Sequence, residues 1–404
     1  MPVTGCTGKD DAAGHGQHPR PLLASRFQGF GVTIFAEMSM LAERTGSINL
    51  GQGFPDSDGP AVVADAAIEA IRSGYNQYPP GLGTPDLRRA IAAHQQRFYG
   101  LEYDPDREVL VTAGATEAIA AAMLALCEST DEVVMFEPTY DSYAPTVAMA
   151  GATRRVVPLR PPSWSFDVEE LAAAITPRTR LLLLNSPHNP TGKVFDAAEL
   201  ACIAKVCIEA DLLVVTDEVY EHLVFEGRHI PLASLPGMGE RTLTVSSAGK
   251  TSSFTGWKIG WICGPAPMVD AVRTVKQFLT YVNGAPFQPA IAVGLGLPDE
   301  FFAGAASDLA LRRDRLCDGL NGAGFEVFRP MATYFAMIDI RTLGDEDGAD
   351  FCRRLPERCG VVAIPASVFY EDPATGRSLV RFAFCKKLEV IDEAVRRLLS
   401  LRQQ

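Results

Sequence analysis

Short apolar runs alternate with longer segments of helical periodicity along most of this chain. Several of the runs, such as residues 181–184 and 212–215, are apolar at consecutive positions, which is typical of strands buried on both faces. The alternation predicts a mostly parallel sheet with crossover helices, and therefore an α/β fold. The predicted strands lie at residues 109–112, 132–136, 155–158, 181–184, 212–216 and 242–246, and the predicted helices at residues 85–99, 116–126 and 197–209.

The pattern changes after residue 258. Residues 259–264 predict one more strand, and residues 268–281 predict a helix that leads out of the large domain. From about residue 299 the order becomes helix, strand, strand and helix, which indicates a smaller domain that closes on a ligand. We predict a mobile tail at residues 1–25, an N-terminal segment of the small domain at 26–55, a large domain at 56–298 and a small C-terminal domain at 299–404.

Three polar residues stand at or beyond the ends of the predicted strands. Asp217 follows a buried run, Asn189 lies in a loop rich in Asn, Pro and Gly, and Lys250 follows a turn of small residues. Ligands of open α/β sheets bind outside the carboxyl ends of the strands, so these side chains are expected to converge on one crevice. Each also has a simpler interpretation, because Asp217 can cap a helix, Asn189 can close an Asn-Pro turn, and most lysines are solvated.

Three motifs carry a resemblance to a known family. They are Asn189-Pro-Thr-Gly192, Thr216-Asp-Glu-Val-Tyr220 and the run from Ser246 to Trp261 that contains Lys250 and Lys258. Together they resemble the class I aminotransferases of fold type I, which depend on pyridoxal 5′-phosphate. The resemblance leaves out only the first 25 or so residues and is closest to the kynurenine, glutamine and methionine aminotransferases and to bacterial proteins assigned as succinyldiaminopimelate aminotransferases. It implies a large domain with a mostly parallel seven-stranded sheet and a smaller α+β domain.

The resemblance also implies the catalytic roles of four residues. Lys250 would hold the cofactor covalently and, once released, would move the proton between substrate Cα and cofactor C4′. Asp217 would keep the pyridine nitrogen protonated, so that the ring can accept electrons. Asn189 and Tyr220 would hydrogen-bond the ring O3′, and the Asn189–Pro190 bond is often cis in the family.

The cofactor phosphate needs hydrogen-bond donors and positive charge. A predicted strand turns through Gly114 into an alanine-rich helix, and the free N–H groups of Gly114, Ala115 and Thr116 make this helix start a candidate phosphate site. An ordinary strand-to-helix turn would explain the same residues. Ser247 and Lys258 match the hydroxyl and cationic phosphate contacts of the family, in which many members have arginine at the position of Lys258.

Four further residues match family positions around the cofactor and the substrate. Tyr140 aligns with the aromatic residue that stacks on the cofactor ring, although a core position explains it as well. Tyr78 matches a tyrosine that reaches the phosphate of the neighbouring subunit, which implies a homodimer with shared active sites. Arg381 matches the bidentate clamp on the substrate α-carboxylate, and Gly53 would let its backbone approach that carboxylate.

Composition limits the other classes of function. The formal charge of −12 argues against binding to nucleic acid or anionic membranes, and no apolar run approaches the ~20 residues that a membrane-spanning helix needs. The nine scattered cysteines favour reduced thiols in a cytoplasmic protein without a signal peptide. The six histidines have no ligand spacing such as HxxxH, so we predict no metal site.

The expected activity is transfer of an α-amino group between an L-amino acid and a 2-oxo acid by a two-stage ping-pong cycle. The substrate stays open between the large aromatic or sulfur-containing side chains of the kynurenine and methionine branch and the long acylated side chain of the diaminopimelate branch. No second arginine near the site obviously serves a dicarboxylate, although a partner subunit could supply one. Two alternatives remain, namely a carbon–sulfur β-lyase on the same fold and a regulatory protein that only binds the cofactor.

Overall fold

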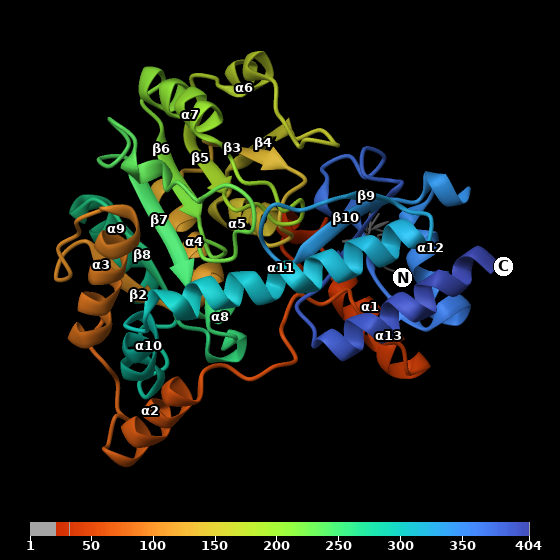
Figure 1. The fold of residues 1–404 in the computed structure, drawn as a ribbon. Coiled ribbons are helices and arrows are strands. Elements are labelled where there is room, and N and C mark those ends of the chain that lie inside the picture. The colour runs from red at the N-terminus through yellow and green to blue at the C-terminus, as the bar shows by residue number, and fades with distance from the viewer. Residues whose placement is uncertain (1–21, 32, 404) are drawn as a thin grey trace, which may run out of the picture.

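The computed structural model describes residues 22–31 and 33–403, and its largest element is a seven-stranded sheet (Figure 1). The strand order is β2-β8-β7-β6-β5-β3-β4. Strand β8 runs antiparallel to both of its neighbours, whereas the remaining neighbouring pairs are parallel. This confirms the predicted mostly parallel sheet. The strands are β2 (Val109–Thr112), β3 (Glu132–Glu137), β4 (Thr153–Pro158), β5 (Thr179–Asn185), β6 (Leu213–Asp217), β7 (Thr242–Ser247) and β8 (Gly260–Cys263).

Helices cover both faces of this sheet, and consecutive residues of the central strands enter different cores. Leu181 and Leu183 of β5 pack in one core with residues of the helices α4, α5 and α9, whereas Leu182 and Leu184 pack in another with α7. A strand buried on both faces must be apolar at every position, which is why this run lacks polar alternation. These helices are α4 (Gly114–Leu126), α5 (Tyr143–Ala150), α6 (Val168–Ala174), α7 (Ala197–Glu209) and α9 (Ala266–Lys276).

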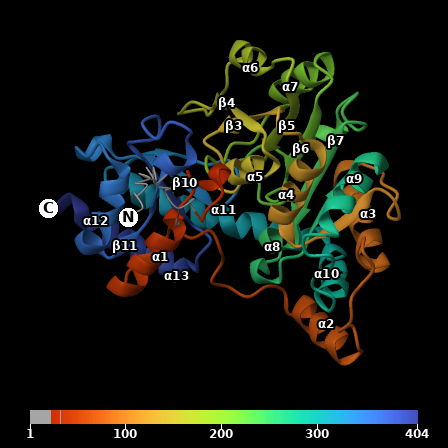
Figure 2. The same ribbon diagram turned by 180° about the vertical axis from the view of Figure 1, so that it is seen from behind.

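A third core lies where β2 and β8 meet the N-terminal helices. Val109 and Trp261 pack there with Leu87 and Ile91 of α3. Figures 1 and 2 show these helices on the side of the large sheet that faces away from α12 and α13. The elements that contribute to this core or pack beside it are α2 (Ala61–Arg72), α3 (Pro85–Tyr99), α8 (Ala248–Thr251), α10 (Phe287–Leu295) and the 3-10 turn η3 (Thr255–Trp257).

A second, antiparallel sheet lies beside the first, with strand order β12-β13-β10-β9. A separate parallel pair, β1 with β11, joins the N-terminal segment to the C-terminal part, with Ile48 opposite Val361. The elements of this part are α1 (Ile34–Thr45), β1 (Ile48–Asn49), α11 (Asp299–Gly322), β9 (Glu326–Phe328), β10 (Phe335–Asp339), α12 (Gly348–Cys359), β11 (Val361–Val362), β12 (Ile364–Pro365), β13 (Leu379–Ala383) and α13 (Leu388–Leu399), with 3-10 turns η1 (Ser25–Phe27), η4 (Arg341–Leu343), η5 (Ala366–Phe369) and η6 (Ser400–Gln403); the remaining turn, η2 (Leu232–Ser234), precedes β7.

The predicted helix at residues 268–281 is wrong in its extent and its direction. Helix α9 ends at Lys276 and packs against α4 on the large sheet, because its apolar residues Val269 and Val272 belong to that core. The long helix α11 instead crosses toward the second sheet and contacts β9 and α13 (Figure 1). The predicted C-terminal order of helix, strand, strand and helix omits α12 and has two strands where the structure has β9 to β13. The division into domains stays a prediction, and residues 1–21 of the predicted tail lie outside the described residues.

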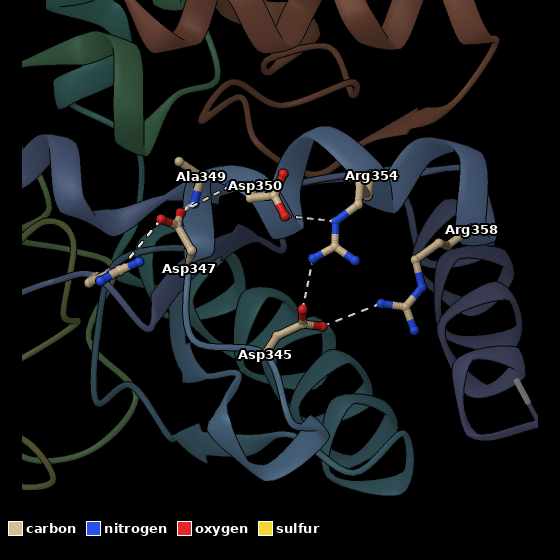
Figure 3. Close-up of polar contacts among 7 residues, drawn as sticks. Asp345, Asp347, Ala349, Asp350, Arg354 and Arg358 are labelled. Atoms are coloured by element: carbon tan, nitrogen blue, oxygen red, sulfur yellow. Dashed lines mark hydrogen bonds and ion pairs between the residues drawn. The ribbon is translucent and has the colours of Figure 1, made fainter.

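Helix α12 is held by an acidic segment at its start (Figure 3). The Asp347 carboxylate accepts hydrogen bonds from the N–H groups of Ala349 and Asp350, which caps the first turn. Asp345 accepts hydrogen bonds from Arg354 at 2.7 Å and from Arg358 at 3.4 Å. Because α12 packs on β12, which pairs with β13, this network supports the strand that carries Arg381.

No helix in residues 22–31 and 33–403 is long and apolar enough to cross a lipid bilayer.

Candidate active site

A cavity of about 350 Å³ lies between the carboxyl ends of the large sheet and the second sheet. Its walls include the ends of β5, β6 and β7, the start of α4, and residues of β10 and β13. The structure thus brings together residues from segments far apart in the sequence. Twelve of the thirteen predicted site residues line this cavity: Gly53, Gly114, Ala115, Thr116, Tyr140, Asn189, Asp217, Tyr220, Ser247, Lys250, Lys258 and Arg381.

Asp217 is the last residue of β6, whereas the predicted strand ended one residue before it. Its side chain is buried, and its Oδ2 accepts a 2.7 Å hydrogen bond from the Tyr143 hydroxyl. Burial raises the pKa of the Asp217 carboxyl to about 6, although the hydrogen bonds from Tyr143 and the Val219 N–H and the charge of Lys250 act in the opposite direction. A positive charge bound nearby would therefore stabilise the ionised form of the Asp217 carboxyl.

Lys250 lies in α8, the single turn that follows β7. Its Nζ is 5.9 Å from the ring centre of Tyr220 and 5.7 Å from that of Tyr334. Burial lowers the pKa of the amine, while the neighbouring Cys385 and Asp217 act in the opposite direction. A larger fraction of neutral amine is therefore present at a given pH, which favours nucleophilic attack.

The loop after β5 fixes the position of Asn189. The Asn185 side chain donates to the carbonyl of Asp217 at 2.8 Å and accepts from the N–H of Asn189 at 2.7 Å. The Asn189–Pro190 peptide bond is cis, as the resemblance predicts. These bonds couple the loop to the end of β6, so Asn189 and Asp217 face the same cavity.

Arg381 is 1% exposed and lies on β13. Its Nη1 donates to Asn189 Oδ1 at 3.0 Å, its Nη2 donates to the carbonyl of Gly51 at 3.1 Å, and its carbon Cζ lies 3.9 Å from the ring centre of Phe335. Nε has no hydrogen-bond partner in the described part of the chain. Burial lowers the pKa of the guanidinium to about 10, which leaves it charged at neutral pH. A buried cation with unused donors suits a carboxylate ligand.

Gly53 lines the cavity at a position with no space for a side chain. A Cβ there would lie 2.4 Å from the Cζ of Phe335 and 3.0 Å from the ring of Tyr334. The Tyr334 hydroxyl donates to the Gly53 carbonyl at 2.6 Å, which holds this backbone in place. The structure therefore agrees with a backbone role for Gly53, whereas contact with a substrate carboxylate stays a prediction.

The start of α4 offers an anion site. Gly114 has φ +77°, a conformation that glycine adopts without strain, and it opens a 13-residue helix. A Cβ at this position would lie 3.3 Å from Lys258 Nζ, so the amine stands directly over the first turn. The helix N–H groups, this amine and Ser247 line the same end of the cavity. Such a combination of donors and positive charge fits a phosphate group.

Tyr78 is the one predicted site residue that does not line the cavity. It is 82% exposed, and its ring packs edge-on against Tyr281 with 5.7 Å between ring centres. Within a single chain it therefore cannot serve the site. The role in a neighbouring subunit stays a prediction.

Sequence reasoning did not identify several residues that shape the site. Tyr143 and Asn185 lie close in the sequence to the predicted site residues Tyr140 and Asn189, but nothing in this spacing shows that their side chains hydrogen-bond Asp217. Phe335 lies on a strand that enters the cavity only through tertiary packing. Asp141 also lines the cavity, and burial raises the pKa of its carboxyl, opposed by the charge of Arg381.

The raised pKa of Asp217 gives a pH prediction for the cofactor-free protein. Because the folded chain binds this proton more tightly than the unfolded chain, the associated stability is complete below pH 3.8 and is lost as the pH rises through about 6. Asp217→Asn removes this titration. As the pH rises from 3.8 to about 6, the wild type loses stability that the variant keeps. The free energy of unfolding of the variant should therefore increase by about 3 kcal/mol relative to that of the wild type. Urea unfolding across this pH range measures it, and parallel curves would contradict the prediction.

Comparison with known proteins shows which family the chain belongs to. The family described as Aminotransferase class I and II matches residues 45–398. The chain belongs to this family, and it is a transferase of amino groups with the predicted type I fold.

Among its relatives, the probable N-succinyldiaminopimelate aminotransferase DapC of Mycobacterium tuberculosis (strain H37Rv) is 54% identical over 95% of this chain and 99% of that protein. The methionine aminotransferase of Escherichia coli (strain K12) is 40% identical over 93% of this chain and 98% of that protein. The solved structure of N-succinyldiaminopimelate aminotransferase from Mycobacterium tuberculosis superposes with a TM-score of 0.92 at 55% identity and covers 94% of this chain and all of that one.

Proposed function

We propose that this aminotransferase uses pyridoxal 5′-phosphate and moves the α-amino group between an L-amino acid with a large or long side chain and a 2-oxo acid. The observation that carries this proposal is the convergence of Lys250, Asp217 and Arg381 on one cavity. An amine, a buried carboxylate and a guanidinium are the groups needed to hold an aldehyde, a pyridinium and an α-carboxylate.

The residues present fit this cofactor. The N–H groups of α4, the Ser247 hydroxyl and the Lys258 amine would hold the phosphate. The buried Asp217 carboxylate would hold a proton at the ring nitrogen, and Tyr140, whose hydroxyl pKa burial raises to about 12, stays neutral beside the ring. Bound pyridoxal phosphate supplies an electron-accepting ring that stabilises the charge left at Cα when its proton departs.

The protein side chains bind the substrate, move its proton and hold the cofactor ring. Arg381 binds and orients the substrate α-carboxylate through its planar guanidinium. Lys250 moves the proton from substrate Cα with its Nζ, which the lowered pKa of the amine makes a better base at neutral pH than a solvated lysine. Asn189 and Tyr220, both buried, would hydrogen-bond the ring hydroxyl.

The lining of the cavity favours a donor without a short dicarboxylate side chain. Among the described residues that line it, the cations are Lys250, Lys258 and Arg381, and no second arginine is present. Asp141 would also repel a side-chain carboxylate held close to Arg381. Two relatives are named as aminotransferases of N-succinyldiaminopimelate and of methionine, and both names agree with a large or long substrate.

A half-reaction panel tests this proposal. The purified protein with bound pyridoxal phosphate is mixed with kynurenine, methionine, glutamine, N-succinyl-diaminopimelate and aspartate, and the change in cofactor absorbance is followed for each. We expect a fast, stoichiometric change and release of the matching 2-oxo acid with at least one long substrate, and a slow change with aspartate. A reaction with none of them, or release of pyruvate and ammonia from a cysteine conjugate without any acceptor, would contradict amino transfer as the main activity.

We further propose a homodimer with shared sites, supported by the exposed aromatic side chains of Tyr78, Phe278 and Tyr281. If the Tyr78 hydroxyl reaches the phosphate of a second copy, Tyr78→Phe should weaken pyridoxal phosphate binding about tenfold, the size expected for one hydrogen bond to a charged group. Fluorescence titration of the cofactor-free protein measures this. Tyr75→Phe, at another exposed tyrosine, is the control, and equal affinity of both variants would contradict the shared site.

The division into domains and the cellular location are also proposals. We propose that the parts around the two sheets, residues 56–298 and residues 299–404 with 26–55, act as domains that close on the substrate, because the cavity lies between them. We propose a cytoplasmic location because the scattered cysteines suit a reducing compartment.

A further inference from the structure

A second cluster of buried polar side chains lies outside the cavity, between α3 and the segment that follows β6. It consists of His94, Glu221 and His222, and one ligand atom of each lies within 4.8 Å of the other two. The Nε2 atoms of the two histidines are 2.7 Å apart. None of the three residues lines the candidate active site.

The fold holds these side chains in an apolar enclosure. His94 lies on the buried face of α3, three and seven residues after the core positions Ile91 and Leu87. The ring centres of Phe98 and Phe302 lie 4.6 Å and 4.4 Å from that of His222. An apolar shell around polar ligands limits water access and strengthens their interaction with a cation.

One oxygen of the Glu221 carboxylate has no hydrogen-bond partner among the described residues. Glu221 is 6% exposed, and Oε1 accepts a 2.5 Å hydrogen bond from the Ser246 hydroxyl. Oε2 makes no hydrogen bond of ordinary geometry within the described residues, although the Tyr99 hydroxyl faces the carboxylate. The nearby Arg97 is paired with Asp299. A buried carboxylate oxygen without a hydrogen-bond partner costs free energy, which a bound cation would offset.

The histidine pair supplies lone pairs to such a cation. A contact of 2.7 Å between two Nε2 atoms requires that at least one of them carries no proton and accepts a hydrogen bond from the other. Both rings can present Nε2 once that single proton is released. His94 Nδ1 has no hydrogen-bond partner among the described residues, so the proton can move to this atom without breaking another bond.

We propose that His94, Glu221 and His222 bind a divalent transition-metal cation, with Zn²⁺ as the best match. Two imidazole nitrogens and one carboxylate oxygen are ligands that Zn²⁺ accepts, and a water molecule on the half-buried side of His222 would complete a tetrahedron. Zn–N bonds of about 2.0–2.1 Å place tetrahedral ligand atoms roughly 3.3 Å apart, so the imidazoles need to separate by about 0.6 Å.

The cation would act as a clamp and take no part in amino transfer. Glu221 directly follows Tyr220 of the active-site cavity, and its partner Ser246 directly precedes Ser247. A metal bond from α3 to this segment would therefore stiffen two walls of the cavity from behind. Its clearest effect is added stability of the folded chain, since a ligand that binds only the folded state raises the melting temperature.

The test uses the full-length protein with bound cofactor, freed of metal by a chelator. After addition of ZnCl₂ and desalting, elemental analysis should find one zinc per chain, and the Tm should rise by roughly 3 °C at a hundredfold excess of free Zn²⁺ over the Kd. His94→Gln and His222→Gln should each weaken zinc binding by at least about 100-fold, more than the loss of an outer partner costs.

The chain has two other neighbouring histidines, His15 and His18, and these provide the matched control. The double variant His15→Gln/His18→Gln should keep the zinc and the Tm shift. Loss of zinc from this double variant would overturn the proposed zinc site. Unchanged zinc binding by both His94→Gln and His222→Gln would overturn it as well. If either single variant fails to fold, Co²⁺ added to the wild-type protein decides, because a tetrahedral site gives intense red-visible absorption and its absence would overturn the proposal equally.

Discussion

Replacing Lys250 with alanine is expected to abolish amino transfer while leaving a folded protein that binds pyridoxal phosphate without a covalent bond. The side chain is proposed to perform two tasks, holding the aldehyde and moving the Cα proton. Among the described residues that line the cavity, the other lysine is Lys258, and it lies over the start of α4 and not beside Asp217. The loss of a positioned base alone costs up to about 10⁴-fold. We therefore expect the rate of the half-reaction to fall by at least about 10⁴-fold.

Stopped-flow absorbance with the best amino acid measures this rate. Lys193→Ala is the matched control, because Lys193 is also a buried lysine but pairs with Glu199 outside the cavity. That variant should lose stability and keep a rate near that of the wild type. A Lys250→Ala protein with a wild-type rate would refute the assigned role.

Replacing Arg381 with glutamine should remove most of the binding of the substrate carboxylate. The guanidinium is buried, and its hydrogen bonds to Asn189 and Gly51 orient it beside the face of Phe335. Loss of one partner of a buried charge pair costs 2–5 kcal/mol, so kcat/KM for the amino acid should fall by about 10³-fold, mainly through KM.

A substrate analogue separates this role from a structural one. Wild-type enzyme should prefer an amino acid over the corresponding decarboxylated amine by about the same 10³-fold, and Arg381→Gln should lose this preference. Arg313→Gln is the control, since Arg313 is also buried but pairs with Glu226 and Asp314 away from the cavity. If Arg381→Gln keeps the preference, the carboxylate binds elsewhere.

Much of the architecture was predictable because burial dictates residue type along the central strands. Consecutive apolar residues, as in 181–184, are typical of a strand covered on both faces. Helix α3 begins and ends where predicted, at Pro85 and Tyr99. The C-terminal part was less predictable. Strands β11 and β12 have two residues each, too few to show periodicity, and α12 contains Pro356, which weakens a helical pattern.

The candidate site was predictable where a short motif carries several of its residues. Asp217, Tyr220 and Lys250 lie in such motifs, whereas the hydrogen bond of Tyr143 to Asp217 and the contact of Phe335 with Arg381 depend on tertiary packing. The histidine cluster shows the same limit. Metal-ligand spacing is read between near neighbours in the sequence, but His94 and His222 are 128 positions apart, so the prediction of no metal site had no means of finding them.

The most direct test of the proposed chemistry is to locate the covalent bond. The protein with bound pyridoxal phosphate is reduced with borohydride, digested with trypsin and analysed by mass spectrometry. A modified Lys250 resists cleavage, so the cofactor should appear on the peptide that runs from Thr242 to Lys258. An adduct on the peptide from Thr251 to Arg273, which would place it on Lys258, or the absence of any adduct, would contradict the account.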